Sequence, residues 1–366
     1  MQLIRHDPTL LASWPGGGPA DAGYPDFFAS PAWARIQIAT CLDAGEAACV
    51  LALGLPGAGP ALLLPVRLPG RARFLPGAHE VAAFITPYST VCSPIAAPGI
   101  DTAEAAAAFA AGFRAACPGT DYLVLEALAE EGPWLAAFRR AFNGAGFFLR
   151  EFEHFGNWYR RTEGLSWHEL RAGLPAQLRN TLDRKGRRLS GGHDGRFTLF
   201  AAPDEAARAR AAYEMVYARS WKVAEPYPQF IGALIESAAQ AGALRLGLLE
   251  IDGAPAAAQI WIVSGGRATI FKLAHDERWK ALSPGSLLTA RVMEHVMTED
   301  RPVEIDFGRG DDSYKKDWLP CRRARRGLIA FDPRRPLGLA GAALERGRAI
   351  IRSLLARYQR ANHASG

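Results

Sequence analysis

Cysteine is scarce in this sequence, and its spacing excludes two common uses. Only five cysteines occur among 366 residues, and no two of them form a CxxC pair. A disulfide framework needs a denser set, and a structural zinc site needs closely spaced ligands. We therefore expect neither a disulfide-stapled fold nor a metal site.

Long apolar runs are lacking too. No run reaches the roughly 18–20 residues that a membrane-spanning helix needs, although 49% of the residues are apolar. The segment from Met1 to Pro8 lacks the basic and then apolar pattern of a secretory signal. These features favour a cytoplasmic protein that is at most peripheral to the inner membrane.

Acidic residues are in a minority, which gives a net charge of +6. A moderate positive charge favours anionic partners such as phosphates, nucleotides or membrane surfaces. The arginine-rich tail, 333–366, suggests contact with an acidic membrane or with a cyclic dinucleotide. No motif that recognises duplex nucleic acid is found in the sequence, so duplex binding is not expected.

The length fits two domains of roughly 150–180 residues. The predicted units are an N-terminal domain at 1–160, a C-terminal domain at 161–332 and a basic helical tail at 333–366. Residues 1–25 are rich in proline and glycine and are predicted to be a loose lead-in.

The second half has the clearer pattern of secondary structure. Apolar periodicity and turn signals predict the order β-α-α-β-β-β-α-β-α-β. The expected ranges are 196–200, 203–220, 228–241, 244–251, 256–263, 268–275, 283–297, 303–307, a short helix near Tyr314, and 327–331. The first half shows a shorter version of the same order, with strands predicted at 147–152 and 157–161.

The helix expected from Ser283 has features of an anion site at its start. Ser283 is a good N-cap, and Pro284 suits the first helical position. The N–H groups of Gly285, Ser286 and Leu287 would then point out of the helix, where its dipole favours negative charge.

Several segments together resemble the bacterial CelD/BcsL-type acetyltransferases, a GNAT branch related to the FemAB peptidyl transferases. The segments are the basic helix from Leu174 to Lys185, Ser220-Trp221-Lys222, the Leu-rich strand within Gly242 to Gly253, Ser283-Pro284-Gly285, and Asp306-Phe-Gly-Arg-Gly310 with Tyr314-Lys315. The resemblance covers about 160–320 well and 26–155 in outline.

This resemblance implies a fold and an activity. The expected fold is α/β (α+β), with tandem GNAT-like units whose mixed, mostly antiparallel sheets are flanked by helices. The expected enzyme is an N-acyltransferase that uses acyl-CoA, by default acetyl-CoA, as co-substrate, with its diphosphate at Ser283, Gly285, Ser286 and Leu287. The family is often associated with exopolysaccharide or envelope sugars, so the expected acceptor is a small-molecule or sugar-linked amine. The usual GNAT phosphate loop carries several glycines, whereas only Gly285 is present here.

Transfer of an acyl group to an amine requires proton removal from the ammonium and stabilisation of the departing thiolate. Strand alternation puts Glu304 and Asp306 on one face, and Asp306 is the candidate base. The alternative is a structural ion pair, for example with Lys272. The resemblance implies that Tyr314 is the acid that protonates the thiolate, and that His275 is a base or substrate contact.

Four further residues are candidate substrate contacts: Trp221, Lys222, Lys272 and Lys315. For each, an ordinary structural role remains open, as core packing, an ion pair or a solvated charge. Two other functions also remain open. One is aminoacyl transfer from charged tRNA to a peptidoglycan precursor, and the other is a non-catalytic nucleotide sensor that regulates polysaccharide synthesis.

Overall fold

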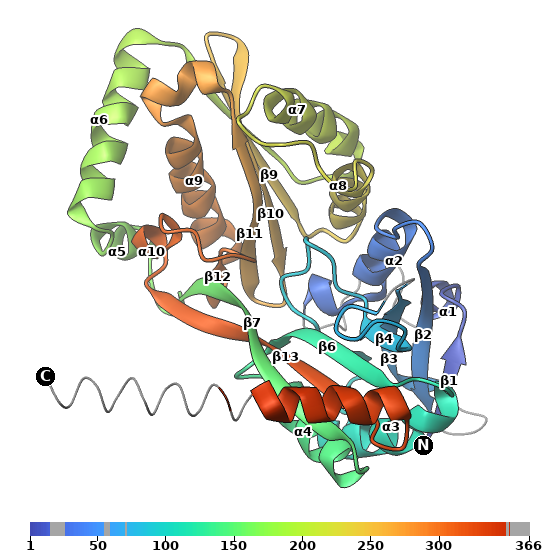
Figure 1. Cartoon of the computed structure of the whole chain (residues 1–366). Helices are drawn as coiled ribbons and strands as arrows, with labels where there is room; N and C mark the ends of the chain where they lie inside the picture. Colours follow the sequence, from blue (N-terminus) through green and yellow to red (C-terminus); the bar gives the residue numbers. More distant parts are fainter. Residues whose placement is uncertain (15–25, 55–58, 70–71, 349–350, 352–366) are drawn as a thin grey trace, which may run out of the picture.

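Strands from both halves of the chain join in one twisted sheet (Figure 1). The structure is a computed structural model and describes residues 1–14, 26–54, 59–69, 72–348 and 351. Within these residues the strand order is β1-β2-β3-β4-β6-β13-β7-β12-β11-β10-β9-β8, and β5 pairs with β3. Most neighbouring strands are antiparallel, while β4–β6 and β11–β12 are parallel.

The two halves repeat the same order of elements. The first half contains β1 (Gln2–His6), α1 (Leu10–Ser13), η1 (Phe27–Ala29), α2 (Pro31–Thr40), β2 (Ala47–Gly54), β3 (Pro60–Leu68), β4 (Glu80–Ala83), β5 (Ile95–Ala96), α3 (Thr102–Ala116), β6 (Tyr122–Ala129), α4 (Pro133–Gly144) and β7 (Phe148–Arg161). The second half contains β8 (Gly195–Phe200), η2 (Pro203–Glu205), α7 (Ala206–Ala218), α8 (Phe230–Gln240), β9 (Leu244–Ile251), β10 (Ala254–Ser264), β11 (Arg267–His275), η3 (Glu277–Leu282), α9 (Pro284–His295), η4 (Val296–Asp300), β12 (Glu304–Asp306), α10 (Lys315–Trp318) and β13 (Cys321–Phe331). Between them lie α5 (Trp167–Ala172) and α6 (Ala176–Gly192).

The last strands of the two halves are exchanged. β13 lies between β6 and β7, and β7 lies between β13 and β12. Each half therefore completes its part of the sheet with a strand from the other half. The antiparallel pair β7–β13, which runs from Tyr159 opposite Cys321 to Phe148 opposite Phe331, joins the halves into one body.

Helices cover both faces of the second-half sheet. α6 and α9 lie on one face, and α7 and α8 lie on the other (Figure 1). The core around α7 and α8 also contains Phe28 and Trp33 from the first half, and Trp33 packs edge-on against Phe230 of α8 with ring centroids 5.6 Å apart. The apolar face of α2 thus packs against the second half and fixes the relative position of the two halves.

The predicted fold class is confirmed, and most predicted elements of the second half appear within a few residues of their expected bounds. The last strand, expected at 327–331, begins earlier, at Cys321. The GNAT-like order occurs in both halves. Because β7 and β13 are exchanged, the proposed units at 1–160 and 161–332 are linked through the sheet as well as through the chain. The division at these positions stays a prediction.

Three local predictions differ from the structure. The expected loose lead-in contains β1, which pairs with β2, and α1; residues 15–25 lie outside the described residues. The strands expected at 147–152 and 157–161 are one continuous strand, β7. The basic tail is helical over 336–348 (Figure 1), and its later residues, apart from Ile351, lie outside the described residues.

Candidate active site

The start of α9 faces a cavity with a volume of about 740 Å³. Pro284 occupies the first helical position, as predicted, and Gly285 follows it at the cavity wall. No described residue accepts a hydrogen bond from the Gly285 N–H, and a Cβ there would lie 3.6 Å from Nδ1 of His275. The helix therefore offers an unpaired N–H and a glycine surface to any group that enters the cavity.

Ser283 and Leu287 differ from the sequence prediction. Ser283 has φ +52°, and its side chain accepts no capping hydrogen bond. Its carbonyl instead accepts from the N–H groups of Ser286 and Leu287, at 3.1 and 3.2 Å. The Ser286 and Leu287 N–H groups are thus both used inside the helix, contrary to the prediction, and Leu287 lines a different cavity. The Ser283 and Ser286 side chains line the main cavity, so their hydroxyl groups are the further donors there.

A buried glutamine fixes the position of this helix start. Gln259, in the middle of β10, donates from Nε2 to the Gly285 carbonyl at 3.0 Å and to Oγ1 of Thr289 at 2.6 Å. Its Oε1 accepts a hydrogen bond from the indole of Trp261 at 3.0 Å. Since Gln259 is fully buried and its side-chain donor and acceptor are both used, the first turn of α9 is held against the sheet.

β11 and β12 pair over a short length and then diverge. Their parallel pairing extends only from Arg267 opposite Glu304 to Thr269 opposite Asp306. Beyond it, β11 bulges by one residue at Phe271 relative to β10, and a second cavity of about 230 Å³ lies between Ile270–Leu273 and the segment after β12. A bulge and a divergent strand pair leave a slot in the sheet.

The two cavities share part of their walls. Lys222, Leu273, Asp312 and Tyr314 line both of them. A ligand bound at the start of α9 can therefore extend along β11 to the slot. The predicted catalytic and substrate residues Tyr314 and Lys222 lie at this junction.

The Tyr314 side chain projects from the start of α10 and packs edge-on against Phe307, with ring centroids 6.0 Å apart. Partial burial raises the pKa of Tyr314 to about 12, so the hydroxyl keeps its proton at neutral pH. No described residue is hydrogen-bonded to it. It can act as a proton donor to a group at the junction.

Lys222 lies on the other side of the junction. Burial and the nearby ammonium of Lys272 lower the pKa of Lys222 to about 8. No described residue accepts a hydrogen bond from its Nζ, which lies 5.7 Å from the ring of Trp221. A lysine with this pKa exchanges a proton readily near neutral pH.

His275 and Trp221 form one wall of the larger cavity. Their ring centroids are 4.4 Å apart, and Trp221 is 52% exposed. Burial lowers the pKa of His275, which favours the neutral imidazole. Because His275 lies against Gly285, the structure places it beside the helix start and away from the slot between the strands.

Asp306 lies in a buried ionic cluster. Its carboxylate accepts from Arg323 at 2.6 Å and from Asn157 at 2.7 Å, and also from the Gly308 N–H. Glu304 beside it pairs with Arg323 and Arg267. Neither carboxylate lines the two cavities. This geometry argues against Asp306 as the base and favours the structural alternative, with arginines instead of Lys272 as partners.

Lys272 and Lys315 also differ from their predicted roles. Lys272 lies past the point where β11 and β12 separate, and it pairs with Glu225 at 2.7 Å. Lys315 is 4% exposed, and its Nζ donates to the carbonyls of Arg309, Phe307 and Gly310 at 2.7, 3.3 and 3.3 Å. An ammonium has three protons, so Lys315 holds the chain after β12 in place and has little capacity left for substrate.

The corresponding helix of the first half carries no comparable anion site. Asp101 caps α3, and its carboxylate accepts from the N–H groups of Ala103 and Glu104 at 2.8 and 2.9 Å. A carboxylate already fills this helix start and would repel a phosphate. The structure therefore favours a single diphosphate site, at α9.

Sequence reasoning missed several residues of the cavity walls. Gln259 interrupts the apolar run of β10, and a polar residue in a buried strand was an available signal. Arg309 belongs to a segment that carried the resemblance, but it received no role. Tyr88 and Thr90 enter the smaller cavity from the first half, and no local pattern indicated this contact.

The comparisons with known proteins agree with this geometry. Residues 176–316 match the sequence model of the acetyltransferase (GNAT) domain. The matched segment contains α9, the parallel strands β11 and β12, and the junction residues Lys222 and Tyr314. The match supports an enzyme that transfers an acyl group to an amine, and the domain implies acyl-CoA as co-substrate. The curated proteins include no significant match to the chain.

Solved structures share the fold across the full chain. FemX is 10% identical and has a TM-score of 0.57, with 91% of this chain and 98% of that chain covered. The C-terminal domain of a proposed lysylphosphatidylglycerol synthetase from Agrobacterium fabrum is 15% identical, with a TM-score of 0.52 and coverage of 87% and 90%. A protein of unknown function from Bacteroides thetaiotaomicron is 10% identical, with a TM-score of 0.52 and coverage of 89% and 97%. At these identities the similarity establishes the fold only.

No helix within the described residues is long and apolar enough to cross a membrane.

Proposed function

We propose that the chain is an acyl-CoA-dependent N-acyltransferase whose acyl donor binds at α9 and whose amine acceptor enters from the smaller cavity. The observation that carries this proposal is that two features lie side by side. One is the Gly285 N–H at the start of α9, which has no acceptor among the described residues, and the other is the slot between β11 and β12. A diphosphate suits the first feature, and an extended thioester arm suits the second.

The residues around the cavity fit acyl-CoA. The Gly285 N–H and the hydroxyl groups of Ser283 and Ser286 supply hydrogen-bond donors for the diphosphate. Lys280 adds a cation at the rim, and it is 72% exposed. The walls along Leu273 and Trp318 are apolar, as the thioester arm requires. Bound acyl-CoA would supply an activated acyl group as a thioester.

The junction residues supply the proton transfers. Lys222 in its neutral form takes a proton from the acceptor ammonium, which frees the nitrogen lone pair for attack on the thioester carbon. As the carbon–nitrogen bond forms, the carbon–sulfur bond breaks, and the Tyr314 hydroxyl donates its proton to the departing thiolate. Direct attack requires no covalent enzyme intermediate, and the walls of both cavities orient the reactants.

The finer assignment rests on the sequence resemblance. Acetyl is the proposed acyl group, and an amino sugar or a related envelope or exopolysaccharide precursor is the proposed acceptor, as in CelD/BcsL-type enzymes. Contact of the basic tail with an acidic membrane, and binding of a cyclic dinucleotide, are proposals of the same kind.

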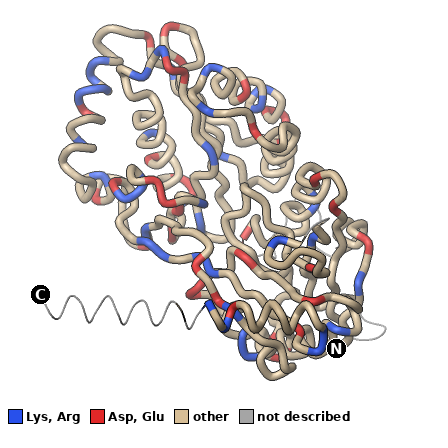
Figure 2. The backbone as a smooth tube through the Cα atoms, viewed as in Figure 1, with Lys and Arg blue, Asp and Glu red and all other residues tan. Residues whose placement is uncertain are grey.

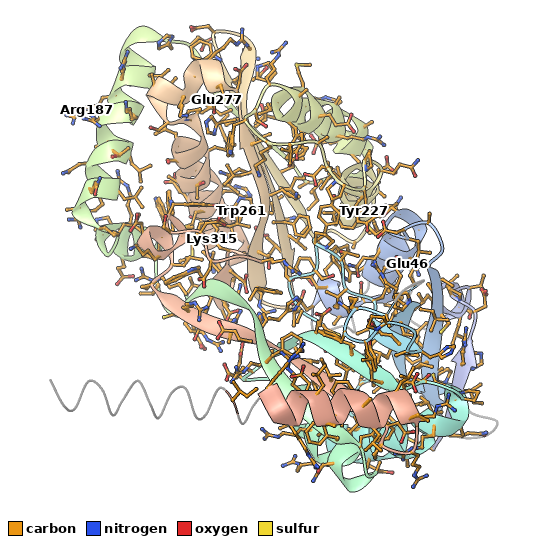
Figure 3. All side chains as sticks on the ribbon, in the orientation of Figure 1. Glu46, Arg187, Tyr227, Trp261, Glu277 and Lys315 are labelled. Carbon is orange, nitrogen blue, oxygen red and sulfur yellow. The ribbon has the colours of Figure 1, made fainter. Side chains whose placement is uncertain are left out.

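Aminoacyl transfer is the second candidate. It is supported by a row of cations on α6, among them Arg184, Arg187 and Arg188, whose side chains are exposed (Figure 2). Figure 3 places Arg187 on the outer side of this helix. α6 also lines the larger cavity, through Gln177, Leu178 and Thr181. A charged tRNA could bind the cations of this helix and place its aminoacyl end in that cavity.

Calorimetry separates these functions. The full chain would be titrated with acetyl-CoA, CoA, a cyclic dinucleotide and charged tRNA, and free thiol release would be followed with a panel of amines. We expect micromolar binding of acetyl-CoA and amine-dependent thiol release. Binding of only the dinucleotide would contradict catalysis, and transfer that depends on charged tRNA would favour the second candidate.

A further inference from the structure

The smaller cavity is built by both halves of the chain. Pro87, Tyr88 and Thr90 from the first half face Ile270–Leu273 of β11 across it. The first-half segment is rigid, because Gln37 donates to the hydroxyl groups of Thr86 and Ser89 at 2.9 and 2.7 Å, and Tyr88 stacks on Phe230 with ring centroids 3.9 Å apart. A group that enters this cavity therefore meets a preformed wall.

Cations predominate in the lining of this cavity. Four of its lining residues are basic, against the single acid Asp312: Lys222, Lys272, Arg309 and Lys315. Lys272 is paired with Glu225, which also accepts from the Tyr88 hydroxyl at 2.7 Å. Lys315 is held by three carbonyls and by Asp312 at 3.1 Å. Two of the four charges are thus compensated within the protein.

Arg309, like Lys222, has no such compensation among the described residues. Its guanidinium packs over the ring of Phe155 at 4.6 Å and makes one long hydrogen bond, of 3.4 Å, from Nη1 to the Thr86 carbonyl. Among the described residues no carboxylate forms an ion pair with it. Burial lowers the pKa of Arg309, as expected for a cation without a close counter-charge.

His154, the second polar neighbour of this guanidinium, does not accept a hydrogen bond from it. Nη2 lies 3.4 Å from Nε2 of His154. Nδ1 of His154 accepts from the Ala127 N–H at 3.0 Å, so the neutral ring carries its proton on Nε2. That Nε2–H lies 3.8 Å from Glu126. Two donors therefore face each other, and most of the five N–H groups of Arg309 lack an acceptor within the described part of the chain.

We propose that Arg309 binds an anionic group of the acceptor, a carboxylate or a phosphate, in the smaller cavity. The inference rests on the proposed function, because it takes this cavity as the acceptor side. A planar guanidinium binds both anions through paired hydrogen bonds, and a cavity of about 230 Å³ has room for such a group on a short stem. The amine of the same molecule then reaches the junction at Lys222 and Tyr314.

Binding of matched probes to the full chain without CoA tests the proposal. Glucosamine 6-phosphate would be compared with glucosamine, and serine with serinamide, by calorimetry. We expect the member that carries the anionic group, in at least one pair, to bind at least tenfold more tightly than its partner that lacks it. The pair that shows this difference identifies the anion as phosphate or carboxylate.

The Arg309→Gln variant should lower the affinity for that charged probe at least tenfold. Arg139→Gln is the matched control, because Arg139 is 52% exposed on α4 and, among the described residues, pairs only with Glu151; it should bind the probe like the wild type. If Arg309→Gln fails to fold, Arg309→Lys replaces it, and a partial loss is expected since the charge remains without the paired hydrogen bonds.

Two results would overturn the inference. One is unchanged binding of the anionic probe by folded Arg309→Gln, and the other is no discrimination between probes with and without the anionic group at millimolar concentration. Acetyl-CoA titrated into the same preparations tests the donor site independently. Intact acetyl-CoA binding with no anion preference would reject this inference and leave the proposed function standing.

Discussion

The Asp306 carboxylate and the Arg323 guanidinium lie 2.6 Å apart, across strands β12 and β13. Both side chains are less than a tenth exposed, and Asn157 of β7 donates to the same carboxylate. Three strands that come from both halves of the chain thus meet at one carboxylate. The role of this carboxylate is structural, because it joins the exchanged strands and lies outside the two cavities.

We expect Asp306→Ala to destabilise the protein. Removing one partner of a buried ion pair leaves an uncompensated charge and typically costs about 3–5 kcal/mol of the free energy of unfolding. Denaturant unfolding measures this loss, with Asp204→Ala, at an exposed position of η2, as control. A stable Asp306→Ala protein that loses all thiol release would contradict us and restore the catalytic interpretation.

Gly285→Trp should block the donor site. Gly285 faces the larger cavity, and a Cβ added there would meet its neighbours His275 and Leu273 at ordinary contact distance, so the fold should tolerate the change. The indole would fill the diphosphate position, and acetyl-CoA affinity should fall at least about 100-fold, or about 2.7 kcal/mol. Calorimetry measures the affinity.

Ala103→Trp is the control for that variant, because Ala103 has the same position in α3 of the first half and is exposed. It should leave acetyl-CoA binding unchanged. Equal affinity of Gly285→Trp and wild type would show that the diphosphate binds elsewhere.

Tyr314→Phe should slow catalysis without weakening donor binding. The hydroxyl is the proposed proton donor to the thiolate, and loss of such a group commonly costs about 100-fold or more in rate. Thiol release gives kcat, and calorimetry gives acetyl-CoA affinity. Tyr213→Phe is the control, since the Tyr213 hydroxyl is buried without a described partner and away from both cavities. A kcat for Tyr314→Phe equal to that of the wild type would remove the tyrosine from the mechanism.

The low pKa of Lys222 makes activity depend on pH. The rate should rise as the pH increases through about 8, because only the neutral amine accepts a proton. In Lys222→Met this ionisation should be missing and kcat should be lower. Lys316→Met, at an exposed position, should keep the wild-type profile. An unchanged profile in Lys222→Met would assign the ionisation to another group.

The same pKa affects stability in a defined direction. The folded value of about 8 lies below the ordinary lysine value of 10.5, so between these pH values the unfolded chain binds more protons. The wild type should therefore gain stability relative to Lys222→Met as the pH rises from 8 towards 10. Denaturant unfolding of both proteins at the two pH values measures the difference, and a relative loss would contradict the assignment.

The order of elements in the second half was predictable from sequence because local chemistry fixes it. The Asp252-Gly253 turn joins β9 to β10, Pro284 begins α9, and apolar periodicity marks the strands between them. The same reasoning indicated Gly285, and the family resemblance indicated Tyr314 and Lys222. The structure brings all three to the walls of connected cavities.

The roles of Asp306, Lys272 and Lys315 were not predictable in this way. Each is a charged residue near a strand end, and its role depends on partners far away in sequence: Arg323, Glu225, and the carbonyls of the loop after β12. A side chain that is solvated in one arrangement is buried and paired in another. Only tertiary contacts distinguish these cases.

The sequence alone determined the order of elements in the second half and the start of α9, because turn residues, helix caps and apolar periodicity act over a few neighbouring residues. Tertiary structure decided that β7 and β13 change places and that Tyr88 and Arg309 meet across one cavity. Strand pairing between the halves depends on which distant edges bury the most apolar surface together, and no short stretch of sequence records that choice.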